Sequence, residues 1–202
     1  SKFIAQIADY PFYNEEMSTL SAAEILDYVV ADRGYDYGNR PKGQILFHKY
    51  EDEIRTAFEE HLVEGALYAR SEDGSVNIHF TVSPAHQAGF EKILEQTREK
   101  YEKRYGVRYN ISFSVQDPST DIIAVNEDNT PFLLANGKPL YRPGGHGALL
   151  KNLDAIDGDV IFLKNIDNVV YQDYLDQTIL WKKVLAGKLI ELREKIFRYL
   201  EL

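Results

Sequence analysis

Two short segments of alternating apolar and polar residues, separated by a helical pattern, limit most strongly what this chain can fold into. Apolar residues occupy every second position in 76–82 and again in 109–115, and this period predicts strands with one buried face. Between them the apolar residues follow helical spacing, with Ser83 and Pro84 suited to the helix start and Gly106 to its end. A strand, helix, strand order needs a crossover connection, so it predicts two parallel strands in an α/β fold.

Helical patterns also precede and follow this unit. The sequence predicts a short helix within residues 1–16 that Pro11 breaks, a helix after the capping box of Ser21 and Glu24, a helix over about Asp52–Ala69, and one or two helices over Tyr171–Leu202, with Gly187 as the break if there are two. Short antiparallel strands are expected between residues 122 and 141, where Asn136-Gly137 predicts a hairpin. The simplest organisation is a single α/β unit over residues 1–202, with a helical preamble (1–40), a core (41–170) and C-terminal helices (171–202).

The overall charge and residue usage exclude several classes of protein. With 23 basic and 32 acidic residues the formal net charge is -9 and the pI is near 5.1, whereas a general nucleic-acid binder needs a basic surface for phosphates. The chain has no cysteines, which rules out disulfides and thiolate chemistry. No apolar run approaches the roughly 18 residues of a membrane span, and no signal peptide opens the chain. We therefore expect a cytoplasmic protein without a nucleic-acid or membrane partner, of unknown oligomeric state.

A glycine-rich loop at residues 142–147 (RPGGHG) precedes a predicted helix. Such a loop is costly unless the backbone turns tightly or approaches another group closely. Gly144, Gly145 and Gly147 can direct backbone N–H groups at an anion such as a phosphate near the helix start. A plain tight turn explains the pattern equally well. His146 can bond a sugar hydroxyl or a base, or it can serve the loop itself.

A second polar cluster follows the apolar run Val160–Leu163, which is expected to form a buried strand. Asn165, Asp167 and Asn168 would then lie at the end of this strand, where open α/β sheets bind their ligands. Their hard oxygen atoms suit Mg²⁺, which binds through one or two carboxylates and the phosphates of a substrate. An Asx-rich turn is an equally good reading of the cluster. His61, on a predicted helix face, is interpreted as a packing histidine outside the site.

These motifs follow one another in an order that resembles a known family. Residues 116–121 (QDPSTD), a hairpin, residues 142–150 (RPGGHGALL) and residues 165–168 (NIDN) occur in this order in UDP-sugar pyrophosphorylases, including UDP-glucose and UDP-N-acetylglucosamine pyrophosphorylases. Residues 41–43 (PKG) also fit that pattern, and the resemblance covers about residues 41–168. More closely, the whole chain looks like the middle of an uncharacterised bacterial domain-of-unknown-function family that shares this nucleotidyltransferase pattern.

The resemblance implies a fold, a site and a reaction. The fold would be a three-layer, Rossmann-like nucleotide-diphospho-sugar transferase type with a mixed, mostly parallel sheet and a small antiparallel flap, in an incomplete version. Gln116 would bind the uracil edge, Asp167 would hold Mg²⁺, and Lys42 would meet phosphate. The nucleotide and sugar would contact the remaining site residues, Gly144, Gly145, His146, Gly147, Asn165 and Asn168. The implied reaction is attack of a sugar-1-phosphate oxygen on the α-phosphorus of UTP with release of pyrophosphate, which depends on alignment and charge neutralisation.

One part of the family's pattern is absent from this sequence. Residues 1–40 contain no glycine-rich loop with an arginine that would wrap a triphosphate, so we expect a fragment that binds nucleotides and sugar phosphates without turnover. The alternative, from another class, is a non-catalytic nucleotide-sugar-binding or interaction module of unknown function. A magnesium phosphohydrolase is less favoured, because only one loop supplies a clear metal carboxylate and two-metal sites need several.

Overall fold

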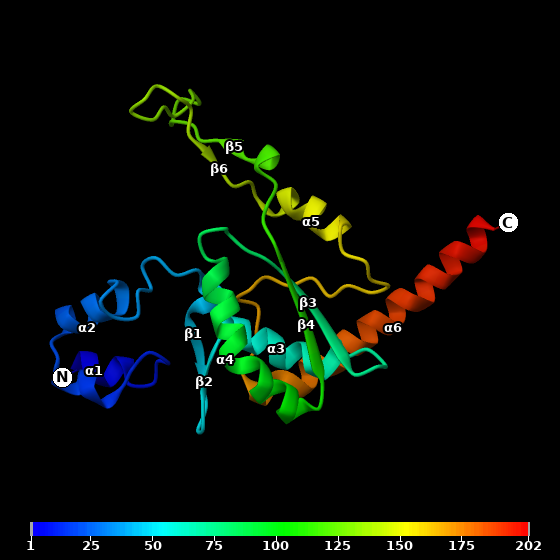
Figure 1. Ribbon diagram of the computed structural model, residues 1–202, viewed down its shortest axis with the longest axis horizontal. Helices are drawn as coiled ribbons and strands as arrows, with labels where there is room; N and C mark the ends of the chain where they lie inside the picture. Colours follow the sequence, from blue (N-terminus) through cyan, green and yellow to red (C-terminus); the bar gives the residue numbers. More distant parts are fainter. Residues whose placement is uncertain (1, 202) are drawn as a thin grey trace. The chain divides into compact units, whose positions relative to one another are not determined.

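Helices and short strands alternate along the chain in the computed structural model, which describes residues 2–201 (Figure 1). The α-helices are α1 (Lys2–Ile7), α2 (Ala22–Val30), α3 (Ala57–Tyr68), α4 (Gln87–Tyr105), α5 (Leu150–Asp154) and α6 (Leu175–Leu200). The strands are β1 (Leu46–Lys49), β2 (Ile54–Thr56), β3 (Ser75–Thr81), β4 (Arg108–Ser114), β5 (Ile122–Ile123) and β6 (Tyr141–Arg142). Short 3-10 helices are η1 (Glu15–Thr19), η2 (Lys42–Gln44), η3 (Pro118–Thr120), η4 (His146–Leu149) and η5 (Gln172–Tyr174). Within residues 2–201 the strands pair as β1–β2, β3–β4 and β5–β6, so the fold is mixed α/β with small sheets.

Contacts divide the structure into two units, and each is described by itself. The first unit comprises Ser1–Ile78, Ala88–Asn110 and Phe162–Leu202, and the second comprises His79–Gln87 and Ile111–Ile161. The first unit holds nearly all the buried apolar side chains. A single α/β unit over residues 1–202, the organisation expected from the sequence, stays a prediction.

Strands β3 and β4 form the parallel pair that the sequence predicts. Arg108 N donates to Gly74 O at 3.1 Å near the start of both strands, and Val82 N donates to Ser114 O at 2.8 Å after their ends. Because the partners advance in the same direction along both segments, the pair is parallel, and α4 is its crossover helix. The predicted helix start at Ser83 is wrong. Residues 83–86 form a turn, in which His86 N donates to Ser83 O at 3.0 Å, and α4 begins only at Gln87.

Helix α3 lies at the centre of the core of the first unit. Its predicted start at Asp52 is wrong, because residues 54–56 pair with β1 as an antiparallel strand instead. The helix begins after Thr56, whose hydroxyl accepts from Glu59 N at 3.2 Å while the Glu59 carboxylate accepts from Thr56 N at 2.8 Å. This reciprocal capping box satisfies two backbone N–H groups at the helix start. The largest fully buried hydrophobic side chains around α3 are Phe58, Leu62, Val63, Val76, Tyr101 and Tyr109.

The N-terminal helices have a small hydrophobic cluster of their own. Ile7, Met17 and Ile25 are buried together there. The capping box predicted at Ser21 and Glu24 is confirmed, with Ser21 N donating to the Glu24 carboxylate at 2.8 Å and Glu24 N donating to Ser21 Oγ at 3.3 Å. These contacts account for the two short helices expected in the preamble.

The antiparallel hairpin and the C-terminal helix also follow the sequence patterns. β5 pairs with β6, with Ile122 opposite Arg142, and Gly137 makes the turn of the Asn-Gly hairpin at a φ of +76°. Helix α6 continues through Gly187 without a break. Within residues 2–201, none of the helices combines the length and the apolar character that crossing a membrane would need.

Candidate functional site

The structure brings together two of the predicted site residues, Lys42 and Asp167. Lys42 Nζ donates to Asp167 Oδ2 at 2.6 Å, although the residues are 125 positions apart in the sequence. Both lie in the first unit. Their side chains are 69% and 36% exposed, and ion pairs that are open to water add little to stability. The hydrogen bond from Lys42 lowers the pKa of Asp167, so its carboxylate is charged at neutral pH. The pair therefore offers one cation and one anion at the surface, while it contributes little to the fold.

The backbone beside Lys42 is held in place by close packing at Gly43. A Cβ atom on this buried glycine would lie 2.6 Å from Phe90 Cε1 and 3.1 Å from Ile166 Cγ1. Real Cβ atoms essentially never approach other atoms as closely as the first distance. Because only glycine fits between the α4 ring and the residue before Asp167, the Pro-Lys-Gly segment is pressed against the Asp167 turn.

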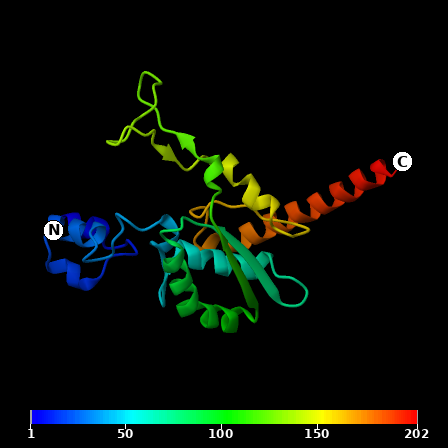
Figure 2. The ribbon, with the colours of Figure 1, turned by 45° about the horizontal axis from the view of Figure 1, so that its top comes forward.

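The segment before Asp167 is extended but forms no strand, so the strand predicted at Val160–Leu163 is wrong. It runs along helix α3 instead (Figures 1 and 2). Phe162 meets the Tyr68 ring edge-on with a centroid distance of 5.0 Å, and Lys164 forms an ion pair with Glu64. An apolar run becomes a strand only where a neighbouring strand is available, and here the neighbour is a helix.

Asn165, Asp167 and Asn168 lie in one turn at the end of this segment. Asn168 N donates to Asn165 O at 3.1 Å, and both asparagines are exposed. The described residues contain no group of three or more His, Cys, Asp or Glu side chains that could hold a metal ion. One carboxylate with neighbouring amide oxygens nevertheless fits Mg²⁺ in the manner in which it commonly binds, through one or two carboxylates, water and substrate phosphates.

The second unit joins two of the other predicted motifs. Gln116 Nε2 donates to Thr120 Oγ1 at 3.1 Å, and a Cβ on Gly144 would lie 2.7 Å from Thr120 O and 3.7 Å from Gln116 Nε2. Lys151 Nζ donates to Asp117 Oδ2 at 2.8 Å, and this bond lowers the pKa of the exposed Asp117 to about 2. The start of the glycine-rich loop is therefore packed against the Gln116 motif.

The other residues of the glycine-rich loop have space around them. Gly145, His146 and Gly147 are exposed, and a Cβ on either glycine would meet no atom within 4 Å. Gly145 has a φ of -71°, which any residue can adopt. Gly144 is thus required by the packing of the unit itself, whereas no contact of the described chain explains the glycines at 145 and 147.

This difference predicts the outcome of three alanine substitutions. Gly144→Ala is expected to destabilise the protein by about 1–3 kcal/mol, because its Cβ would collide with the Thr120 carbonyl. Gly145→Ala and Gly147→Ala are expected to leave stability unchanged. Thermal unfolding followed by circular dichroism measures all three. An equal loss at Gly145 and Gly144 would show that the whole loop is glycine-rich for the sake of the fold.

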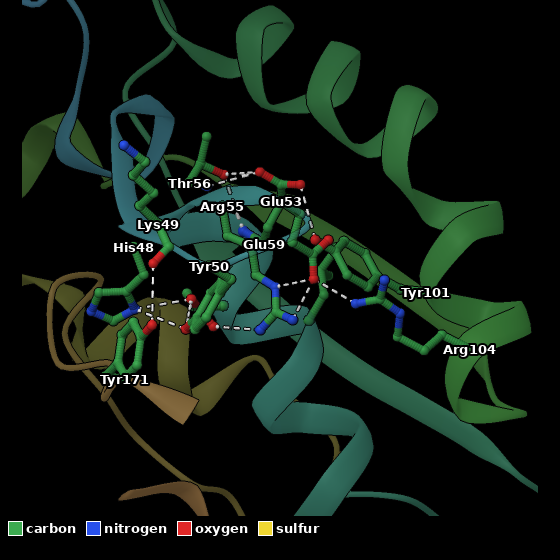
Figure 3. A network of polar contacts seen from close by, with 12 residues as sticks. His48, Lys49, Tyr50, Glu53, Arg55, Thr56, Glu59, Tyr101, Arg104 and Tyr171 are labelled. Atoms are coloured by element: carbon green, nitrogen blue, oxygen red, sulfur yellow. Dashed lines mark hydrogen bonds and ion pairs between the residues drawn. The ribbon is translucent and has the colours of Figure 1, made fainter. Parts of the chain in front are cut away.

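A network of buried polar side chains between β1, β2 and α3 was not predicted from the sequence (Figure 3). The fully buried Glu60 carboxylate accepts from Tyr50 OH at 2.6 Å and from Arg55 Nη1 at 3.3 Å, and His48 Nδ1 lies 2.9 Å from it. Arg55 also bonds to Glu53 and lies 4.4 Å from the centre of the Tyr50 ring. Burial, and then the hydrogen bond to Glu60, raises the pKa of Tyr50. Arg55 pairs with both Glu53 and Glu60, so we assign this network to the stability of the fold.

One signal in the sequence could have located this network. Thr56 followed by Glu59 has the capping-box pattern. This pattern would have started the helix at Ala57 and left residues 54–56 free to pair as a strand. Arg55 would then have been predicted on a strand next to the helix that carries Glu60.

Comparison with known proteins identifies the family. A protein-family model described as a domain of unknown function, DUF4301, matches residues 1–202. The chain belongs to this family. Neither the curated proteins nor the solved structures contain a match.

The DUF4301 assignment confirms the domain of unknown function expected from the sequence. The relationship to UDP-sugar pyrophosphorylases stays a prediction. The site residues of this DUF4301 chain form two sets, with Lys42, Asn165, Asp167 and Asn168 in the first unit and Gln116, Gly144, Gly145, His146 and Gly147 in the second.

Proposed function

We propose that this DUF4301 chain binds a nucleoside triphosphate or a UDP-sugar together with Mg²⁺, with Lys42 and Asp167 as the phosphate and metal ligands. The observation that carries the proposal is their 2.6 Å contact across 125 residues. The resemblance names the same two residues for phosphate and metal. An exposed pair that adds little stability is well suited to exchange its partners for those of a ligand.

The chemistry of the pair fits a metal-phosphate ligand. Phosphate oxygens offer Lys42 an anion that can replace the Asp167 carboxylate, and the carboxylate is then available to Mg²⁺. Asn165 and Asn168, in the same turn, add neutral oxygens. Bound Mg²⁺ would neutralise phosphate charge, which is the main requirement of uridylyl transfer. Because residues 1–40 lack the triphosphate loop of the pyrophosphorylases, we propose binding without turnover.

The finer fold assignment belongs to the same proposal. The parallel β3–α4–β4 unit is the element that a Rossmann-like nucleotidyltransferase fold would contain, and the β5–β6 hairpin would correspond to its small antiparallel flap. Gln116 would contact the nucleobase, and Gly145, His146 and Gly147 would approach the nucleotide or sugar. The open space around these glycines supports a close approach of a ligand to the backbone.

Calorimetric titration with UTP, with and without Mg²⁺, tests the proposal on the 202-residue chain. We expect Mg²⁺ to strengthen UTP binding, and Asp167→Asn to remove this gain and to weaken binding by about tenfold or more, equivalent to at least ~1.4 kcal/mol. Lys42→Met should weaken binding with and without Mg²⁺. His146→Ala, which changes a predicted site residue of the second unit, should also weaken UTP binding.

Asp52→Asn is the matched control for Asp167→Asn. It makes the same change in charge at an aspartate that is 74% exposed and whose ion pair to Arg104 is 3.9 Å long, so UTP affinity should stay at the wild-type value. No binding of UTP or UDP-glucose to the wild type, or equal affinities for wild type and Asp167→Asn, would reject the proposal. Pyrophosphate release from UTP and a hexose-1-phosphate would instead make the chain an enzyme.

A further inference from the structure

We propose that His61 and Glu64 of helix α3 are positioning residues for Asp167, which hold its turn in place without contacting the ligand. This inference rests on the proposed function, because it concerns the same turn. The sequence pattern assigned His61 to packing and gave Glu64 no role. Their contacts place both residues against the segment that ends at Asp167.

One face of α3 meets the extended segment in a regular order. Positions 61, 64 and 68 are three and four residues apart, so they share a helix face. Tyr68 contacts Phe162, Glu64 pairs with Lys164, and His61 Nε2 lies 3.0 Å from Ile166 O. The segment therefore runs antiparallel to the helix, and every second residue of it contacts α3.

The residues between these contacts face away from the helix. Ile161 is 38% exposed and Leu163 is 75% exposed, and Asn165 is also exposed. This alternation is that of a β-strand, although α3 takes the place of the neighbouring strand. A shift of the segment by one residue would exchange its two faces, so the three contacts determine which way Asp167 points.

The ion pair in the middle of this contact is buried. Glu64 is 1% exposed and the Lys164 side chain is 11% exposed. Tyr68 OH donates to Glu64 Oε2 at 2.9 Å, and the other oxygen of Glu64, Oε1, has no hydrogen-bond partner among residues 2–201. Keeping an incompletely bonded carboxylate inside the protein is costly, and a hydrophobic contact would stabilise the fold more cheaply. The charged pair has the advantage of fixing one register of the segment.

His61 acts closest to the candidate site. Its half-buried ring bonds to the carbonyl of Ile166, the residue directly before Asp167. The side chain of Ile166 lies next to Gly43, with Cγ1 3.1 Å from where a Cβ atom on that glycine would be. The Asp167 turn is thus held between α3 and the backbone next to Lys42, and release of either contact would let Asp167 move away from Lys42.

The first test measures release of the segment without any ligand. Trypsin cleaves after Lys164 only if this side chain leaves Glu64, so limited digestion followed by mass spectrometry reports on the contact. We expect His61→Ala and Glu64→Gln to accelerate cleavage at Lys164 by about tenfold, the equivalent of one lost hydrogen bond. His61→Gln should behave like the wild type, because its amide nitrogen can replace ring Nε2 as a donor.

Tyr109→Phe is the control for general destabilisation. It removes the hydrogen bond from Tyr109 OH to Leu62 O at 2.8 Å, which also ends on α3 but does not involve the segment. Cleavage at Lys164 in this variant should rise only in proportion to cleavage at the other sites. Unchanged cleavage in His61→Ala and Glu64→Gln would overturn the inference, whatever the protein binds.

The second test measures the consequence for the site. With Mg²⁺ and UTP, His61→Ala should bind about five- to tenfold more weakly than the wild type, as expected for one net hydrogen bond. His61→Gln should restore affinity, and Tyr109→Phe should not change it. A released segment with unchanged UTP affinity would overturn the positioning role. A wild type that does not bind UTP would reject the proposed function, and the digestion would still decide whether His61 and Glu64 hold the turn.

Discussion

Replacement of Arg55 by methionine is expected to lower the free energy of unfolding by about 3–5 kcal/mol, the usual cost of leaving a buried charge without its partner. Arg55 is 4% exposed and bonds to both Glu53 and Glu60. Methionine keeps much of the side-chain volume and removes the charge. Glu60 would retain its contacts with His48 and Tyr50 but would lose its arginine partner in a buried environment. Urea unfolding followed by circular dichroism measures the loss.

Lys188→Met provides the comparison on the surface. Lys188 Nζ lies 2.9 Å from the Glu191 carboxylate on helix α6, with both side chains about half exposed. Its removal should change the free energy of unfolding by less than about 0.5 kcal/mol. If Arg55→Met cost no more than this, the network around Glu60 would have to be far more accessible to water than the structure indicates.

Acidification is expected to remove roughly 3 kcal/mol of stability through Glu53 alone. This carboxylate is 7% exposed. Its burial would raise its pKa, but hydrogen bonds from Lys100, Arg55 and Arg104 outweigh burial and lower the pKa from 4.5 to about 2. A carboxyl group whose pKa is lower in the folded than in the unfolded chain stabilises the fold above the unfolded value. This contribution is fully present above pH 4.5 and is lost as the pH falls towards 2.

Urea unfolding at several pH values between 7 and 2 tests this dependence. Glu53→Gln should be less stable than the wild type at pH 7, and the difference should shrink as the pH approaches 2. Asp117→Asn is the control for the dependence of stability on pH. Asp117 also has a pKa lowered to about 2, but its carboxylate is exposed, so this substitution should change that dependence less than Glu53→Gln does. If the wild type and Glu53→Gln lost stability in parallel on acidification, another group would be responsible.

The elements predicted correctly are those that local periodicity determines. The strands on either side of α4 alternate with period two, and Ser21 with Glu24 caps α2 as its pattern indicates. The errors occur where a distant contact decides the structure. The spacing of Ile54, Phe58 and Leu62 predicts one helix face, yet residues 54–56 form a strand that buries Arg55 against Glu60. The capping box of Thr56 and Glu59 marks the start of α3, but the pairing of residues 54–56 with β1 depends on another part of the chain.

The candidate site was likewise only partly predictable from the sequence. The residues alone indicate either a Mg²⁺ site or an Asx-rich turn at Asp167 and the asparagines beside it, and the resemblance adds Lys42 as a partner for the same ligand. The contribution of His61 was not predictable, because its partner is the main-chain oxygen of Ile166. Any residue at position 166 has this oxygen, so no side-chain pattern reveals the contact.

The pairing of β3 with β4 also determines how the amide hydrogens of these strands exchange with solvent. Within residues 2–201 their sheet contains two named strands, and the outer edge of β3 is also paired near its start, through a bridge between Arg70 and Val76. In a parallel pair, alternate N–H groups of a strand point at the neighbour and the others point outwards. Deuterium uptake should therefore alternate between slow and fast from residue to residue along residues 78–81 and 110–114, beyond the Arg70–Val76 bridge and the bond from Tyr109 N to Glu102. A polypeptide that added a strand to either edge would protect the fast set and abolish the alternation.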